Sequence, residues 1–138
     1  MKIILKITIM LVSIFAANSV LAQKISSFDA KKFQFAISED KNPQIVDVRT
    51  KAEFDAEHIK GAINVDINQV DFQKKIVKKL KKDRIVYVYC TKGVRSLRAA
   101  EILSNLDFIR IYNLEGGLNE WKKQGFPVKT NNDKGKTY

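Results

Sequence analysis

Cysteine and histidine are nearly absent from this sequence, which contains one of each among its 138 residues. A single cysteine excludes a fold stabilised by internal disulfide bonds, because those bonds need cysteines in pairs. One histidine and one cysteine also cannot form a closed zinc site, so we expect no metal. The lone cysteine, Cys90, is therefore either a small buried apolar side chain or a reactive thiol.

Long hydrophobic runs are missing as well. The apolar segment from Ile7 to Ala17 is shorter than the roughly 20 residues that a membrane-spanning helix requires. Lys2 and Lys6 precede it and Val20-Leu21-Ala22 follow it, in the order typical of a secretory signal peptide. We expect residues 1–22 to be removed, the protein to be periplasmic or secreted, and no stable membrane insertion afterwards. The alternatives are a buried N-terminal helix or an uncleaved anchor.

The rest of the chain is long enough for one domain and too short for two. We assign residues 23–128 to that domain. Residues 129–138 are polar and lack an apolar period, which is typical of a loose C-terminal tail.

Acidic residues are outnumbered, with 25 lysines and arginines against 15 aspartates and glutamates, a net charge of +10. Without Lys2 and Lys6 the balance is 23 against 15, or +8. Six lysines lie between residues 74 and 82, but no aromatic side chains alternate with them as a nucleic-acid stacking surface would need. We interpret this stretch as the solvated face of a helix and expect small anions, not nucleic acid, as partners.

Short apolar runs alternate with segments of helical period. We expect strands at 44–48, 62–65, 85–89 and 109–112. We expect a first helix around Ala30-Phe33-Ile37, capped by Ser26 or Ser27, and a second from the Thr50–Glu53 capping box to about Glu57. A third helix is expected around Phe72-Ile76-Val77-Leu80, and a short last one around Trp121. Between them we expect a helix at 96–106, with its apolar residues Ala99, Ile102, Leu103 and Leu106 facing inward. This alternation predicts an α/β fold with a mostly parallel central sheet and helices on both faces.

In such sheets the ligand site lies outside the carboxyl ends of the strands. Residues 47–49, 90–96 and 113–117 follow predicted strands and should meet there. Cys90 comes directly after the most apolar strand, which favours a reactive thiol.

The segment from Cys90 to Ser96 leads from a strand directly into a helix. Backbone N–H groups at a helix start lack intrahelical partners and can surround an anion. Gly93 permits the tight turn, and Lys92 and Arg95 add positive charge. Such settings lower a cysteine pKa from about 8.5 to roughly 3.5–7.5. An inert packed cysteine would leave this basic, glycine-containing loop unexplained.

Four motifs, in order, resemble those of rhodanese domains. C-T-K-G-V-R-S at 90–96 resembles the family's C-x-x-G-x-R-S loop, and D-V-R at 47–49 with E-F at 53–54 and H-I-K-G-A-I-N at 58–64 resembles its upstream segment. L-E-G-G at 114–117 with Trp121 resembles its ending. The likeness covers about residues 25–128. The sequence departs from the family pattern at two positions: Glu57 stands where the family usually has Gly, and Asp66 stands where a Pro often follows the short strand. Arg98 lies on the helix just after the loop. We expect these residues to alter the rim of the site.

The resemblance implies a single rhodanese-like domain with sulfurtransferase activity and no cofactor. Cys90 would carry a persulfide, and Thr91, Lys92, Gly93, Val94, Arg95 and Ser96 would bind an anionic sulfur donor such as thiosulfate. A thiol or cyanide-like acceptor would then remove the sulfur. Two alternatives are a persulfide carrier or binding module without enzymatic activity, and a phosphatase or arsenate reductase, whose loops place one more residue between Cys and Arg.

Three further charged or polar residues lie beside the expected site. Asp47 and Arg49 follow a strand, and we favour a brace between loops over anion binding by Arg49. His58 is expected to be structural, hydrogen-bonding backbone near the Gly61 turn, because a persulfide cycle needs no separate base when the loop itself generates the thiolate. Gly116 and Gly117 are expected to form a turn that needs backbone freedom.

Overall fold

A five-stranded, fully parallel sheet forms the centre of the computed structural model, which describes residues 24–131. Its strand order is β1 (Ile25–Phe28), β6 (Ile111–Leu114), β5 (Val86–Tyr89), β2 (Gln44–Asp47) and β4 (Ile63–Asn64). The predicted signal peptide lies outside the described residues. Within residues 24–131, no helix has the length and apolar character needed to cross a bilayer.

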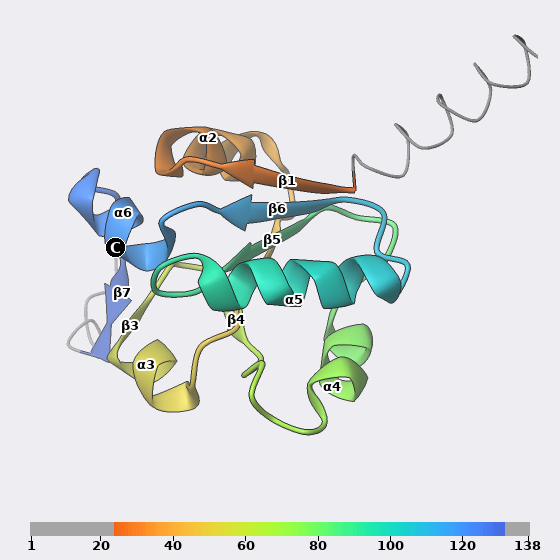
Figure 1. Ribbon diagram of the computed structural model, residues 1–138. Coiled ribbons are helices and arrows are strands. Elements are labelled where there is room, and N and C mark those ends of the chain that lie inside the picture. Colours follow the sequence, from red (N-terminus) through yellow and green to blue (C-terminus); the bar gives the residue numbers. More distant parts are fainter. Residues whose placement is uncertain (1–23, 132–138) are drawn as a thin grey trace, which may run out of the picture.

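Helices cover both faces of this sheet (Figure 1). On one face lie α2 (Ala30–Glu39) and α6 (Gly117–Lys123), and on the other lie α4 (Phe72–Lys79) and α5 (Val94–Asn105). Side chains of β5 point alternately to the two faces of the sheet, so the core consists of two layers. Val86 and Val88 pack with α4 and α5, whereas Tyr87 and Tyr89 pack with α2 and α6. The α/β fold predicted from the sequence is confirmed.

The two helices on the α5 face differ slightly from their sequence patterns. Helix α5 begins at Val94, two residues earlier than predicted, because Gly93 takes a left-handed conformation (φ 97°) that ends the loop there. Its Ala99 and Leu103 are buried. In α4, Phe72 and Ile76 are buried as predicted, but Val77 is 38% exposed and lies outside the core.

The first strand was not predicted, and the helix cap was assigned to the wrong residue. Ser26 and Ser27 lie in β1, paired in register with Tyr112 and Asn113 of β6. Asp29 caps α2 instead, where its carboxylate accepts a hydrogen bond from Lys32 N at 2.8 Å. The pairing with β6 satisfies the backbone of this serine-containing segment, which its composition alone did not indicate.

The last predicted strand is displaced by two residues. It was expected at 109–112 but lies at Ile111–Leu114, and Ile109 is 56% exposed. The backbone of Ile109 instead donates to Lys82 O at 3.0 Å, in the loop before β5.

The predicted loose tail begins with ordered structure. Lys129–Thr130 form β7, which pairs antiparallel with β3 (Glu57–His58). Trp121 Nε1 donates to Pro127 O at 3.0 Å and holds the chain just before this strand. The start of the tail at residue 129 was therefore wrong, because an edge strand supplied partners for its backbone; residues 132–138 lie outside the described part.

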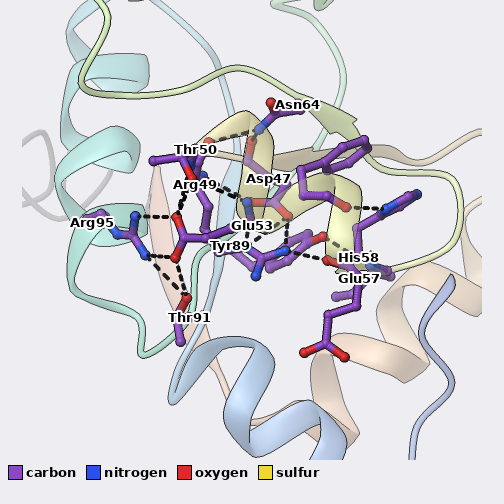
Figure 2. A network of polar contacts seen from close by, with 12 residues as sticks. Asp47, Arg49, Thr50, Glu53, Glu57, His58, Asn64, Tyr89, Thr91 and Arg95 are labelled. Atoms are coloured by element: carbon purple, nitrogen blue, oxygen red, sulfur yellow. Dashed lines mark hydrogen bonds and ion pairs between the residues drawn. The ribbon is translucent and has the colours of Figure 1, made fainter. Parts of the chain in front are cut away.

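Helix α3 (Lys51–Ala56) has the predicted capping box. Thr50 Oγ1 accepts from Glu53 N at 3.3 Å, and Glu53 Oε2 accepts from Thr50 N at 3.0 Å. This helix lies near the carboxyl end of β2 and carries Glu53 toward the loop that follows β5 (Figure 2).

Candidate active site

The loop from Cys90 to Gly93 joins the central strand β5 to α5 at the carboxyl edge of the sheet. The ends of β2 and β6 lie on either side of β5, so all three segments predicted to meet do so. Val48 N donates to Tyr89 O at 3.1 Å on one side, and Leu118 N donates to Cys90 O at 2.8 Å on the other.

The Cys90 sulfur lies at the centre of a ring of donors. Sγ accepts hydrogen bonds from Gly93 N at 3.1 Å and Ser96 N at 3.4 Å, and its thiol donates to Ser96 Oγ at 3.3 Å. Once the thiol is ionised, that hydroxyl can donate to the thiolate. Burial raises the pKa of Cys90, but the hydrogen bonds from Ser96, Gly93 and Lys92 outweigh burial and lower the pKa overall.

The start of α6 presses against the back of this loop. Besides the bond from Leu118 to Cys90, Asn119 N donates to Thr91 O at 3.1 Å. A Cβ on Gly117 would lie 2.5 Å from the carbonyl oxygens of both Cys90 and Thr91. Gly117 therefore does more than allow a turn, because only a residue without a side chain permits this approach.

Arg95 is engaged by Glu53, which the sequence reasoning did not place in the site (Figure 2). Arg95 Nη1 and Nη2 donate to the two carboxylate oxygens of Glu53 at 3.0 and 2.9 Å, and Nη2 also donates to Thr91 Oγ1 at 3.2 Å. The hydrogen bonds from Arg95 lower the pKa of Glu53 to about 2. Arg95 lies in the loop as expected, but the carboxylate of Glu53 offsets its positive charge.

A depression of about 270 Å³ opens beside the sulfur. Its lining comprises Glu53, Cys90, Thr91, Lys92, Val94 and Arg95. Lys92 is exposed, and among the described ion pairs none involves it. With Arg95 neutralised by Glu53, Lys92 supplies the uncompensated cation at this opening.

Asp47 and Arg49 form a buried brace (Figure 2). Arg49 Nη2 donates to Asp47 Oδ2 at 2.7 Å and to Glu57 O at 2.6 Å, and Arg49 Nε donates to both Asp47 oxygens at 3.0 Å. Asn64 Nδ2 donates to the backbone oxygens of both residues. This pair joins β2 to α3 and β3, while Arg49 is only 4% exposed, which leaves it little surface for an incoming anion.

His58 lies apart from the sulfur. Its Nδ1 is 2.8 Å from Phe54 O, and its ring stacks on the Phe54 ring with centroids 3.9 Å apart. His58 thus hydrogen-bonds backbone as expected, but its partner is Phe54 O of α3 and not a group at the Gly61 turn. Within residues 24–131, no cluster of three His, Cys, Asp or Glu side chains could hold a metal ion.

Comparison with known families decides the identity of this domain. The sequence matches the rhodanese-like domain over residues 29–124. The chain belongs to the rhodanese family. The resemblance drawn from its four motifs is thereby confirmed.

Several rhodanese-family relatives carry functional names. The chain is 31% identical over 94 residues to the thiosulfate sulfurtransferase GlpE of Vibrio cholerae, covering 68% of this chain and 86% of that protein. It is 27% identical over 104 residues to a sulfurtransferase of Allochromatium vinosum, covering 75% and 94%. It is 41% identical over 78 residues to the uncharacterized protein YqhL of Bacillus subtilis, covering 56% of this chain and 60% of that protein.

Solved structures show the same fold. A rhodanese-like domain protein from Staphylococcus aureus superposes with a TM-score of 0.64 at 30% identity, covering 76% of this chain and 99% of that one. The rhodanese-like domain of the Anabaena protein Alr3790 superposes with a TM-score of 0.67 at 28% identity, covering 75% and 78%. The chain is thus a single rhodanese-like domain whose relatives include sulfurtransferases.

Proposed function

We propose that this protein is a sulfurtransferase that moves a sulfane sulfur through a persulfide on Cys90. The observation that carries the proposal is the convergence of Gly93 N, Ser96 N and Ser96 Oγ on the Cys90 sulfur. These groups favour the thiolate, which is the nucleophilic form of cysteine. The relatives named as sulfurtransferases support the same reaction class.

The first step takes sulfur from an anionic donor such as thiosulfate. The Cys90 thiolate attacks the outer sulfur of thiosulfate, a new S–S bond forms, and sulfite leaves with the electron pair of the bond that breaks. The product is a Cys90 persulfide in the ring of backbone donors. Lys92, at the opening, favours the approach of the dianion.

The second step regenerates the thiolate. An acceptor thiolate or cyanide attacks the outer persulfide sulfur, and the bond between that sulfur and Cys90 Sγ breaks. Cys90 leaves as a thiolate, which the same donors stabilise, so the cycle needs no separate base. His58, already bonded to Phe54 O, is not required for either step.

The geometry favours sulfur over a phosphoryl group. Both terminal nitrogens of Arg95 donate to Glu53, which leaves fewer donors for a bidentate contact with phosphate oxygens. Four residues separate Cys90 from Arg95, one fewer than in the phosphatase and arsenate reductase loops. A carrier role remains the second candidate, because the chain is 26% identical to a putative sulfur carrier protein, YrkF of Bacillus subtilis, over 100 residues, which are 52% of that protein.

A paired assay separates these functions. Purified protein would be given thiosulfate with cyanide in one reaction and an aryl phosphate at equal concentration in another. We expect thiocyanate formation and negligible phosphate release. Phosphate release without sulfur transfer would overturn the proposal, whereas one stoichiometric sulfur transferred per chain, with slow turnover, would identify a carrier.

Export is a separate proposal that rests on residues 1–22. Their charge and apolar order support a periplasmic or secreted protein that begins at Gln23.

A further inference from the structure

A second hollow lies on the flank of α5, the helix whose first residues line the Cys90 depression. It measures about 540 Å³ and is lined by residues of α5, of the start of α4 and of the connection from β4 to α4. In Figure 1 this connection passes below α5. The apolar lining of the hollow includes Ile67, Val70 and Ile102. Val70 is fully exposed at its edge.

The hollow and the Cys90 depression are both lined in part by residues of α5. Val94 lines the depression, whereas Arg98 and Ile102 line the hollow. These three residues are spaced at i, i+4 and i+8, so they follow one another on the helix surface. Val94 is 77% exposed and adds an apolar side chain at the edge of the depression.

The charge along this surface is positive. Lys74 and Arg98 line the hollow and take part in none of the ion pairs found among residues 24–131. The acidic residue in its lining, Asp71, is paired with Lys75 at 3.1 Å. Lys92 adds an exposed cation at the depression. An occupant should therefore combine apolar side chains with carboxylates.

We propose that this hollow docks an acidic, apolar segment of a protein that presents a cysteine thiol to the Cys90 persulfide. The inference rests on the proposed sulfurtransferase function and adds the class of acceptor. A small donor such as thiosulfate needs the depression alone, so the neighbouring hollow serves the second half of the cycle. The acceptor thiolate attacks the outer persulfide sulfur, Cys90 leaves as a thiolate, and the partner departs carrying the persulfide.

The spacing sets the form of the acceptor. Val94 and Ile102 are eight residues apart, which is about 12 Å along a helix. An extended chain covers that distance with about four residues at roughly 3.3 Å each. The acceptor cysteine should thus lie about four residues from the acidic, apolar segment that enters the hollow.

Synthetic peptides test this inference on the intact protein. The probe has a cysteine, a spacer of four glycines and serines, and a segment in which leucines alternate with aspartates and glutamates. A second peptide replaces every acidic residue with lysine, and 2-mercaptoethanol serves as a small acceptor. The measured quantity is the rate of sulfur transfer from persulfidated protein to each thiol.

We expect the acidic peptide to accept sulfur at least about tenfold faster than the lysine peptide. Arg98→Glu and Val70→Asp should remove most of this preference and leave transfer to 2-mercaptoethanol unchanged. Lys79→Glu is the matched control, because Lys79 is an exposed α4 lysine outside the hollow and its reversal changes net charge equally. Circular dichroism would verify that all three variants fold.

Equal rates for the two peptides would overturn the inference. Equal loss in Arg98→Glu and Lys79→Glu would also overturn it, because that result indicates general attraction of polyanions, including anionic membranes, to a basic protein. If the wild type forms no persulfide, the proposed function fails, and fluorescence anisotropy of the labelled acidic peptide then decides on docking. Binding that Arg98→Glu abolishes and Lys79→Glu retains supports the docking surface, whereas no binding contradicts it.

Discussion

Replacing Gly117 with alanine should displace the loop that holds Cys90. The added Cβ would lie 2.5 Å from the carbonyl oxygens of Cys90 and Thr91, whereas ordinary contact begins at 3.4 Å. The loop and the start of α6 must therefore separate by about 0.9 Å, the difference between 3.4 and 2.5 Å. Backbone atoms cannot rotate away as a flexible side chain would, so the two hydrogen bonds from α6 to the loop should weaken or break.

The magnitude follows from two contributions. A non-glycine residue in the left-handed region costs about 1–2 kcal/mol, and Gly117 has φ 59°. Loss of two backbone hydrogen bonds adds about 1–3 kcal/mol. We therefore expect Gly117→Ala to lower the free energy of unfolding by about 2–5 kcal/mol.

Gly125 supplies a matched control in the same conformation. Its φ is 78°, but an added Cβ would meet nothing within 4 Å. Gly125→Ala should therefore cost only the conformational term, about 1–2 kcal/mol. Its rate of sulfur transfer should stay close to that of the wild type, whereas displacement of the nucleophile by nearly 1 Å should slow Gly117→Ala about 100-fold.

Urea unfolding and a thiosulfate:cyanide assay measure the two effects. Both should be performed at a temperature where each variant is fully folded, so that the rate reports geometry alone. If the two alanine variants lose the same stability, or if Gly117→Ala transfers sulfur at the wild-type rate, the packing of α6 against the loop does not position Cys90 as described.

Three further predictions concern the loop and the N-terminus. Ser96→Ala removes a hydrogen-bond donor to Cys90 and should raise the pKa of the thiol. Alkylation of wild-type Cys90 by iodoacetamide should increase at a pH below the usual thiol pKa of about 8.5, and alkylation of the variant should increase at a higher pH than that of the wild type. Superimposable pH profiles of the two proteins would contradict this role of Ser96. Glu53→Gln should cost less than about 1 kcal/mol at pH 7, because the Arg95 pair is a third exposed. The pKa of Glu53 is about 4.3 in the unfolded chain and about 2 in the folded protein. The Glu53 carboxylate therefore contributes fully to stability above about pH 4.3, and this contribution is lost as the pH falls toward 2. Urea unfolding should show the difference in free energy of unfolding between wild type and Glu53→Gln shrinking over that range. Protein from the natural host should begin at Gln23 by N-terminal sequencing, and an intact Met1 would contradict export.

The fold was largely predictable because its strands and helices have strong local patterns. The run before Cys90 is apolar at every position and occupies the centre of the sheet, where both faces are covered. The Thr50–Glu53 capping box is visible as a spacing of three residues and forms as predicted. The position of Cys90 at the carboxyl end of β5 follows from the same reasoning.

Features that depend on partners distant in sequence were missed. Segment β1 contains two serines and becomes a strand because β6 pairs with it, and β7 forms because β3 offers an open edge. Glu53 could be identified as a helix-capping residue, but its pairing with Arg95, 42 residues further on, depends on how α3 packs. The need for glycine at position 117 likewise depends on tertiary packing, because a Cβ there would collide with the loop only where α6 contacts it.

The central claim is tested most directly by the intact mass of the protein after treatment with thiosulfate and removal of the reagent. Wild-type protein should gain the mass of one sulfur atom per chain and lose it again on addition of cyanide. Folded Cys90→Ser should gain none, because a hydroxyl at this position has no base to activate it. A wild-type mass that does not change, or an equal gain in Cys90→Ser, would contradict the persulfide mechanism.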